Sequence, residues 1–88
     1  MAVHAAEAAL REEARGVYEW SNGPHDTYAE HVHAYRKMLV CVSGSIEFHL
    51  TGGETIRLRS GDRMEIAPGT RHSAVVGPDG CVCVEGKQ

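Results

Sequence analysis

The stretch SIEFHLTGGETIRLR, residues 45–59, decides the fold class of this chain. Apolar side chains recur at every second position on both sides of a central glycine pair: Ile46, Phe48, Leu50, Ile56 and Leu58. A period of two is typical of a β-strand with one buried face. A Gly-Gly pair between two such runs is typical of a tight β-hairpin. The stretch therefore predicts an antiparallel hairpin that buries one face.

Short apolar runs separated by turn residues continue outward from this hairpin. We expect further strands at residues 17–21, 28–33, 36–43, 63–67, 72–76 and 81–85, with 28–33 and 36–43 either separate or parts of one bent strand. Gly44 is expected to turn the chain between two strands, and residues 77–80 (Gly-Pro-Asp-Gly) to do the same later. Strands that recur every 8 to 12 residues or so predict an all-β sandwich or barrel.

The N-terminal segment has a different composition. Residues 3–15 are rich in alanine, leucine, glutamate and arginine, which favour helix, and Gly16 follows as a stop. The apolar stripe is thin, so we expect the helix to lie on the barrel exterior or to contact a partner; a partly frayed terminal helix is the alternative. The predicted organisation is a helical segment over residues 1–16 and a barrel domain over residues 17–88.

Composition bounds the class of protein. The chain has 88 residues and a formal net charge of −3, which gives no basic footprint for nucleic acid. So short a chain has a thin core, and exposed strand edges favour pairing, so we expect a homodimer. Three cysteines form no disulfide framework, and no apolar run is long enough for a signal peptide or a membrane span. These features favour a cytoplasmic protein.

Three histidines carry the strongest chemical signal. His31 and His33 are two positions apart, so on a strand both project to the same face. Two neighbouring imidazoles inside a barrel gain most by sharing a metal ion. Alone, this pair is a weak signal and is better explained by a polar strand face in solvent. His72, which follows a Pro-Gly-Thr turn, supplies a third ligand of the same kind.

The order of these residues resembles the two sequence motifs of the cupin superfamily. His31-Val-His33 is followed at motif spacing by Lys37 and then Gly44, and Gly61 is followed by Pro68-Gly69-Thr70-Arg71-His72. The resemblance covers roughly residues 23–85. It implies an all-β fold, a small cupin jelly-roll (double-stranded β-helix) barrel with a short N-terminal α-helix, and a metal held by His31, His33 and His72.

Four positions depart from the motifs. His25 stands in place of the first glycine of motif one, Ala67 in place of a proline, and Val76 in place of the final asparagine of motif two. The important departure is Lys37, which occupies the position of the glutamate that completes the usual ligand set. The resemblance thus supplies three histidines and no carboxylate.

Lys37 shares the strand parity of His33, so its side chain should point toward the metal. An ammonium has no lone pair and cannot be a ligand. At about 5 Å from a dication and an effective dielectric of about 20, the repulsion is about 6 to 7 kcal/mol. Lys37 is therefore neutral, or an anion lies between the charges, or no metal binds, or the ammonium turns away to a carboxylate such as Glu47 or Glu65.

Three neutral imidazoles leave a divalent transition metal (Zn, Fe, Ni, Mn or Cu) with an open coordination position, as in catalytic sites. A metal beside Lys37 would attract a small anionic molecule such as a keto acid. Lys37 and Tyr35 are the candidate catalytic residues, with Tyr28 as a further candidate proton donor. Either tyrosine could instead be a packing aromatic.

Several alternatives remain open. Cys81 and Cys83 could join His31 and His33 in a zinc site, although this would leave His72 unexplained. Cys41 is expected to fill the barrel interior, and His4, His25 and His49 to lie on the surface, with His25 able to approach the mouth of the site. The candidate functions are a metal-dependent oxygenase, isomerase or decarboxylase, a non-catalytic binding or sensing module, and a metal-free barrel in which Lys37 holds an anion.

Overall fold

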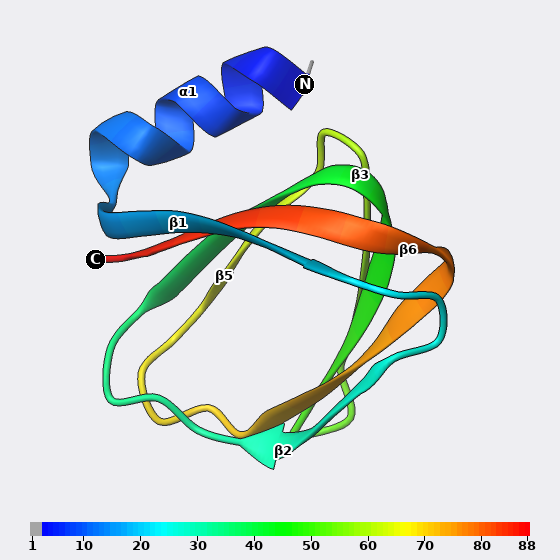
Figure 1. Ribbon diagram of the computed structural model, residues 1–88. Helices are drawn as coiled ribbons and strands as arrows, with labels where there is room; N and C mark the ends of the chain where they lie inside the picture. Colours follow the sequence, from blue (N-terminus) through cyan, green and yellow to red (C-terminus); the bar gives the residue numbers. More distant parts are fainter. Residues whose placement is uncertain (1–2) are drawn as a thin grey trace.

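A computed structural model describes residues 3–88 of the chain (Figure 1). One helix precedes six strands: α1 Val3–Glu13, β1 Arg15–Asn22, β2 Thr27–His31, β3 Lys37–Leu50, β4 Thr55–Arg59, β5 Arg63–Ile66 and β6 His72–Lys87. The all-β prediction with one short N-terminal helix is confirmed, and so is the hairpin, which joins β3 to β4 through the Gly52-Gly53 turn.

Two long strands organise the sheet. β3 and β6 pair with each other in antiparallel fashion, and the order through the sheet is β1-β6-β3-β4. β2 pairs with the first part of β6, and β5 pairs with the first part of β3. The long strands bend, so the strands wrap around a common interior to give a small jelly-roll barrel (Figure 1).

The prediction of a turn at Gly44 is wrong, because β3 continues through it from Lys37 to Leu50. Gly44 has a φ of 70°, which favours glycine, and it lies against the backbone of Gly80 on β6. A Cβ at Gly44 would lie 2.0 Å from the Gly80 carbonyl oxygen. Gly44 therefore allows two strands to meet closely where the ladder is irregular, rather than reversing the chain.

Residues 77–80 likewise do not separate two strands. They form an irregularity inside β6, which pairs with β3 on both sides of it: Val76 is opposite Ile46, and Cys81 is opposite Gly44. One residue of β3, Ser45, thus faces four residues of β6. The two predicted strands at 72–76 and 81–85 are two parts of one bent strand.

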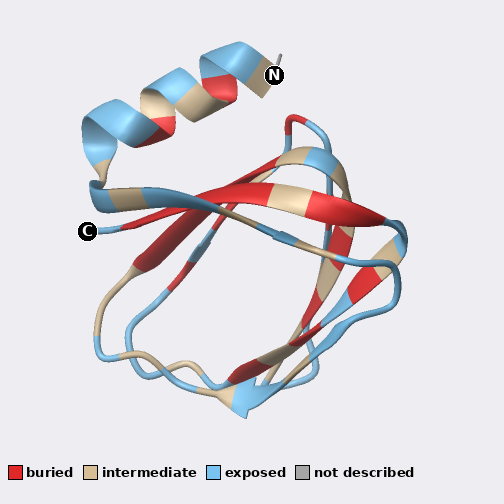
Figure 2. Cartoon of the chain, in the orientation of Figure 1, coloured by how far each residue is buried: buried red, intermediate tan, exposed pale blue. Residues whose placement is uncertain are grey.

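The sheet buries residues on both of its faces, in two separate clusters. Figure 2 shows buried positions along both long strands. The barrel interior holds the larger cluster, which includes Leu39, Phe48, Leu58 and Val76. On the outer face, α1 packs against β3 and β6, as expected for a helix on the barrel exterior. Its buried residues Ala6 and Leu10 contact a second cluster made by Met38, Val40 and Val84.

Within residues 3–88, no helix has the length and apolar character needed to span a membrane.

Candidate metal centre

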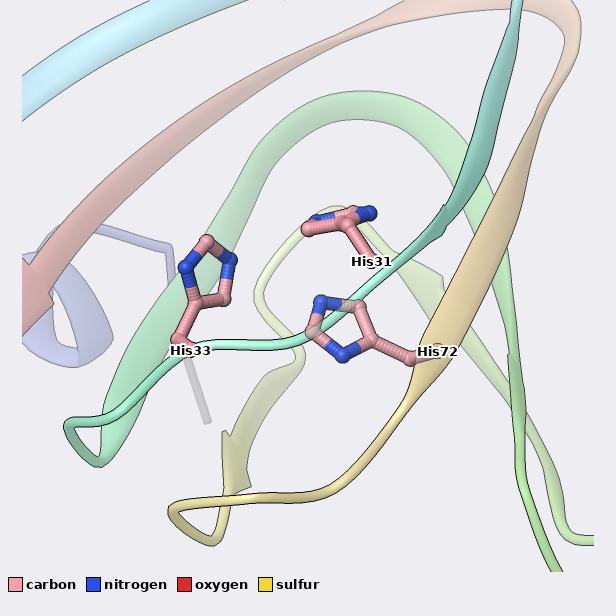
Figure 3. Close-up of side chains that lie close together, drawn as sticks. All are labelled: His31, His33 and His72. Carbon is pink, nitrogen blue, oxygen red and sulfur yellow. The ribbon is translucent and has the colours of Figure 1, made fainter.

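Strand pairing brings the first and third histidines together. His31 ends β2 and lies directly opposite His72, the first residue of β6. His33 follows in the segment that joins β2 to β3, where its carbonyl oxygen accepts a hydrogen bond from the Gly69 amide. β2 is thus shorter than predicted, yet His31 and His33 still face the same region (Figure 3).

The three imidazoles meet closely. One ligand nitrogen from each ring lies within 4.8 Å of the other two. The ring centroids are 4.2 Å apart for His31 and His72, 4.9 Å for His31 and His33, and 5.4 Å for His33 and His72. Among residues 3–88, this is the one group of three or more potential ligands that could hold a metal ion.

Backbone carbonyls orient two of the rings. Nδ1 of His31 lies 2.9 Å from the Ala29 carbonyl oxygen, and Nδ1 of His72 lies 3.0 Å from that of Thr70. A carbonyl only accepts, so each Nδ1 carries the proton and donates it, which leaves the Nε2 lone pair free. A backbone carbonyl behind a ligating imidazole is the usual support of a metal-bound histidine.

The Nε2 atoms of His33 and His72 are buried and have no hydrogen-bond partner among the described residues. Burying an imidazole nitrogen without a partner is costly, and a metal ion supplies the missing contact. Burial also lowers the pKa of both His33 and His72, with Lys37 adding to the effect. Both rings are therefore neutral at neutral pH, the form that binds metal. The donor set fits a divalent metal.

Lys37 lies inside the barrel near these rings, but its charge is paired. Its Nζ is 3.2 Å from Oε1 of Glu85, and both side chains are less than a tenth exposed. The predicted partners Glu47 and Glu65 are wrong: Glu47 contacts Arg57 and His49, while Glu65 contacts Arg36 and Arg63. The lysine therefore stays in the interior beside a carboxylate from β6.

Glu85 is a further candidate site residue, which the sequence did not indicate. Its Oε2 accepts a hydrogen bond of 2.9 Å from the Tyr18 hydroxyl, and its Oε1 accepts one of 3.0 Å from Trp20 Nε1. The signal was strand parity, since Glu85 shares a face with the buried Cys81 and Cys83. A glutamate at the end of an apolar strand face needs a buried partner.

His31, His33 and the Lys37–Glu85 pair border one cavity of about 300 Å³. This volume is at the small end of the range for ligand-binding pockets. The lining combines imidazoles, aromatic rings and the charged pair: Tyr18, Trp20, Tyr28, His31, His33, Tyr35, Lys37, Phe48, Ala74 and Glu85.

Both tyrosines named as candidates line this cavity. The Tyr35 ring lies 4.8 Å from that of His33, and Lys87 Nζ lies 4.5 Å from the Tyr35 ring centroid. Tyr28 donates a hydrogen bond to Asn22 and packs edge-on against Trp20. Burial raises the pKa of each phenol, so both keep their protons at neutral pH.

The remaining candidates lie elsewhere. Cys41, Cys81 and Cys83 are free thiols buried in the interior cluster and do not meet the histidines, so the alternative zinc site does not form. His25 lines a second hollow, next to Gly77, that shares no lining residue with the cavity. It has a φ of 63°, the left-handed conformation that a glycine would adopt without strain. His4 is exposed and His49 half-buried.

Comparison with known proteins assigns the family. The family model for the cupin domain matches residues 18–84. The chain is similar to an uncharacterised conserved protein with a double-stranded β-helix domain from Klebsiella pneumoniae, with 30% identity, a TM-score of 0.70, and coverage of 81% of this chain and 64% of that one. It is also similar to KdgF from Halomonas sp., with 26% identity, a TM-score of 0.68 and coverage of 81% and 66%.

The fold is shared more widely. The cupin domain of CENP-C from Drosophila melanogaster has 20% identity and a TM-score of 0.75, with 84% of this chain and 61% of that chain covered. A search of curated protein sequences finds no significant match. The chain spans somewhat less than two thirds of the length of the first of these relatives. The matched region contains all three histidines and the sheet that positions them, so the chain belongs to the cupin domain family.

Proposed function

We propose that this protein holds a divalent transition metal through His31, His33 and His72 and binds a small anionic molecule at the open coordination position. The observation that carries the proposal is the pair of buried Nε2 atoms, on His33 and His72, that have no partner among the described residues. The ring contacts that bring these atoms together support a shared ion rather than three separate hydrogen bonds.

The donor set determines what the metal can do. Three neutral imidazoles leave the full positive charge on the ion and at least one position for water or a ligand. Such an ion polarises a carbonyl or lowers the pKa of a bound water to about 7. The chemistry this favours is oxygenation, isomerisation or decarboxylation of a small carboxylate, with Lys37 and Tyr35 as the polar groups beside the reacting atoms.

A non-catalytic binding or sensing module is the second candidate. Here the barrel captures a small anion without transforming it, with or without a metal, and Lys37 anchors the ligand. The observation that favours it is that Lys37 lines the cavity with its charge held in place by Glu85. Solved structures of similar fold include a DMSP lyase and the CENP-C cupin domain, so the fold alone decides nothing about catalysis.

Metal titration of protein purified without a histidine tag tests the proposal. We expect one equivalent of Zn²⁺, Ni²⁺ or Mn²⁺ to bind per chain in isothermal titration calorimetry. His72→Gln should weaken binding by more than the roughly 10- to 100-fold that loss of an outer-shell partner costs, because it removes a direct ligand.

The matched control is His49→Gln, since His49 lies outside the cluster and pairs with Glu47. This variant should bind metal like the wild type. If wild-type protein takes up no metal from any of the three salts, the proposed metal centre is wrong. The metal-free binding module, in which Lys37 holds the anion, would then remain. The measured quantity throughout is the affinity for metal, so no enzymatic assay is required.

A further inference from the structure

The Lys37 ammonium has hydrogen-bonding capacity to spare. It carries three N–H donors, and among the described residues its charged partner is Glu85, whose Oε1 lies 3.2 Å away in an ion pair. The ring of Phe48 lies 5.7 Å from its Nζ and satisfies none of these donors. Since Lys37 borders the cavity, the remaining donors are available to a ligand there.

The carboxylate of Glu85 is held in place by contacts of its own, so it does not take up the remaining donors of Lys37. Tyr18 and Trp20 both donate hydrogen bonds to it and the Lys37 ammonium forms an ion pair with it, so three groups share its two oxygens. A carboxylate held by this many donors is well stabilised where it stands. Its role is to hold the ammonium in place, which makes Glu85 a positioning residue.

The cavity thus has two polar regions of different kinds. The histidine region offers an open position on a dication, and the Lys37 region offers unused charged donors. Phe48 and Ala74 contribute apolar wall. Because the charges of Lys37 and Glu85 offset each other, a bound dication leaves the cavity with an excess of positive charge. The ligand it favours is a small anion with a second oxygen donor.

We propose that Lys37, positioned by Glu85, is a carboxylate-binding subsite, and that the ligand is a small hydroxy or keto carboxylate. Its carboxylate contacts the ammonium while its second oxygen reaches the metal. This rests on the proposed function, because it needs the metal at the three histidines. The subsite proposal adds the chemical class of the ligand and names Lys37 as the residue that selects this ligand.

Three-carbon probes of matched size test the subsite on the zinc-loaded protein. Lactate has a carboxylate and a hydroxyl, lactamide replaces the carboxylate by an uncharged amide, and propanoate lacks the hydroxyl. Trp20 is the one tryptophan of the chain, lines the cavity and contacts Glu85, so its fluorescence reports binding, with calorimetry as a second readout. We expect lactate to bind about tenfold or more tightly than either analogue, the size expected for one charge-assisted hydrogen bond.

Variants then assign the preference to Lys37. Lys37→Met should abolish the advantage of lactate over lactamide while zinc still binds. Lys87→Met removes the same charge from a residue that contacts Tyr35 and does not line the cavity, and it should keep the advantage. Glu85→Gln should reduce the advantage, because the ammonium loses its anchor.

The outcomes separate the two proposals. Zinc binding with equal affinity for lactate and lactamide would overturn the subsite and leave the metal centre standing. An unchanged preference in folded Lys37→Met would do the same. Failure of the wild type to bind zinc would overturn both proposals together. The comparison of the three probes uses wild-type protein alone, so a variant that fails to fold does not remove the test.

Discussion

The Nζ atom of Lys37 lies 3.2 Å from Oε1 of Glu85, inside a barrel whose other polar residues include three clustered histidines. Lys37 begins β3 and Glu85 lies near the end of β6. The ion pair therefore links the two long strands that organise the sheet. This pairing supports our proposal that a lysine at the motif position of the usual glutamate belongs to a working site. The lysine is paired with a carboxylate that itself lines the cavity, that of Glu85.

Replacing Lys37 with the glutamate of the usual cupin motif should destabilise the protein when it is the only change. The same replacement should be tolerated when Glu85 is changed to glutamine as well. Lys37→Glu places two carboxylates together in the interior, and removing one partner of a buried pair costs about 3–5 kcal/mol. The double variant Lys37→Glu/Glu85→Gln restores a hydrogen-bonded pair and adds a possible fourth ligand. We expect the single variant to unfold at lower temperature and the double variant to bind zinc more tightly than wild type.

Calorimetric zinc titration and thermal unfolding of both variants check this. A single variant as stable as wild type would show that Glu85 does not need a positive partner.

The metal-free protein should lose stability as pH falls below 6.5. Burial lowers the folded-state pKa of His33 and His72 below that ordinary value, so the folded rings stay neutral while the unfolded chain takes up protons. The unfolded state then binds more protons, and the free energy of unfolding decreases with falling pH. Urea unfolding between about pH 5 and about pH 8 measures this slope. His72→Gln should make the slope shallower, and His49→Gln should leave it unchanged.

At the alkaline end, Tyr18 should be the phenol that resists ionisation. Partial burial and the hydrogen bond to Glu85 raise its pKa from 10.0 to about 12. The folded protein keeps a proton that the unfolded chain loses, so this contribution to stability is present below pH 10.0 and lost between there and about pH 12. Tyrosinate absorbance measured on Tyr18→Phe should lack the step of highest pKa. An unchanged titration curve would show that the Glu85 contact is not made in solution.

Docking of α1 should contribute to stability without affecting the metal centre. Leu10 is fully buried against Met38, Val40 and Val84 on the outer face of the sheet. Leu10→Ala should cost about 2–5 kcal/mol in free energy of unfolding, as large-to-small core substitutions do. Zinc affinity should not change, because the histidines lie on the interior side. Glu12→Ala, at an exposed position of the same helix, is the control and should leave both quantities unchanged.

The sequence predicted most of the strands and all three metal-binding candidates, because alternation and spacing report directly on which face a residue occupies. It placed Lys37 inside the barrel for the same reason. It did not identify Glu85 as the partner of Lys37, since the two residues are far apart in sequence and meet only through the β3–β6 ladder. Parity indicates that a residue points inward, but only the register between strands shows which inward residues touch.

The turns were the other source of error. Gly44 and the Gly-Pro-Asp-Gly segment at 77–80 have the composition of chain reversals, and composition does not distinguish a reversal from an irregularity within a paired strand. Gly44 is required by the approach of Gly80, a contact between residues distant in sequence. Local signals could not reveal it.

The irregularity at residues 77–80 has a consequence for the cavity itself. His72 and Glu85 are thirteen positions apart on β6, an odd number, so on a regular strand they would point to opposite sides of the sheet. The extra residues reverse the alternation, and both ends of the strand present their side chains to the interior. The mismatch in length between β6 and β3 thus allows one strand to supply both a histidine of the metal centre and the carboxylate that lines the cavity.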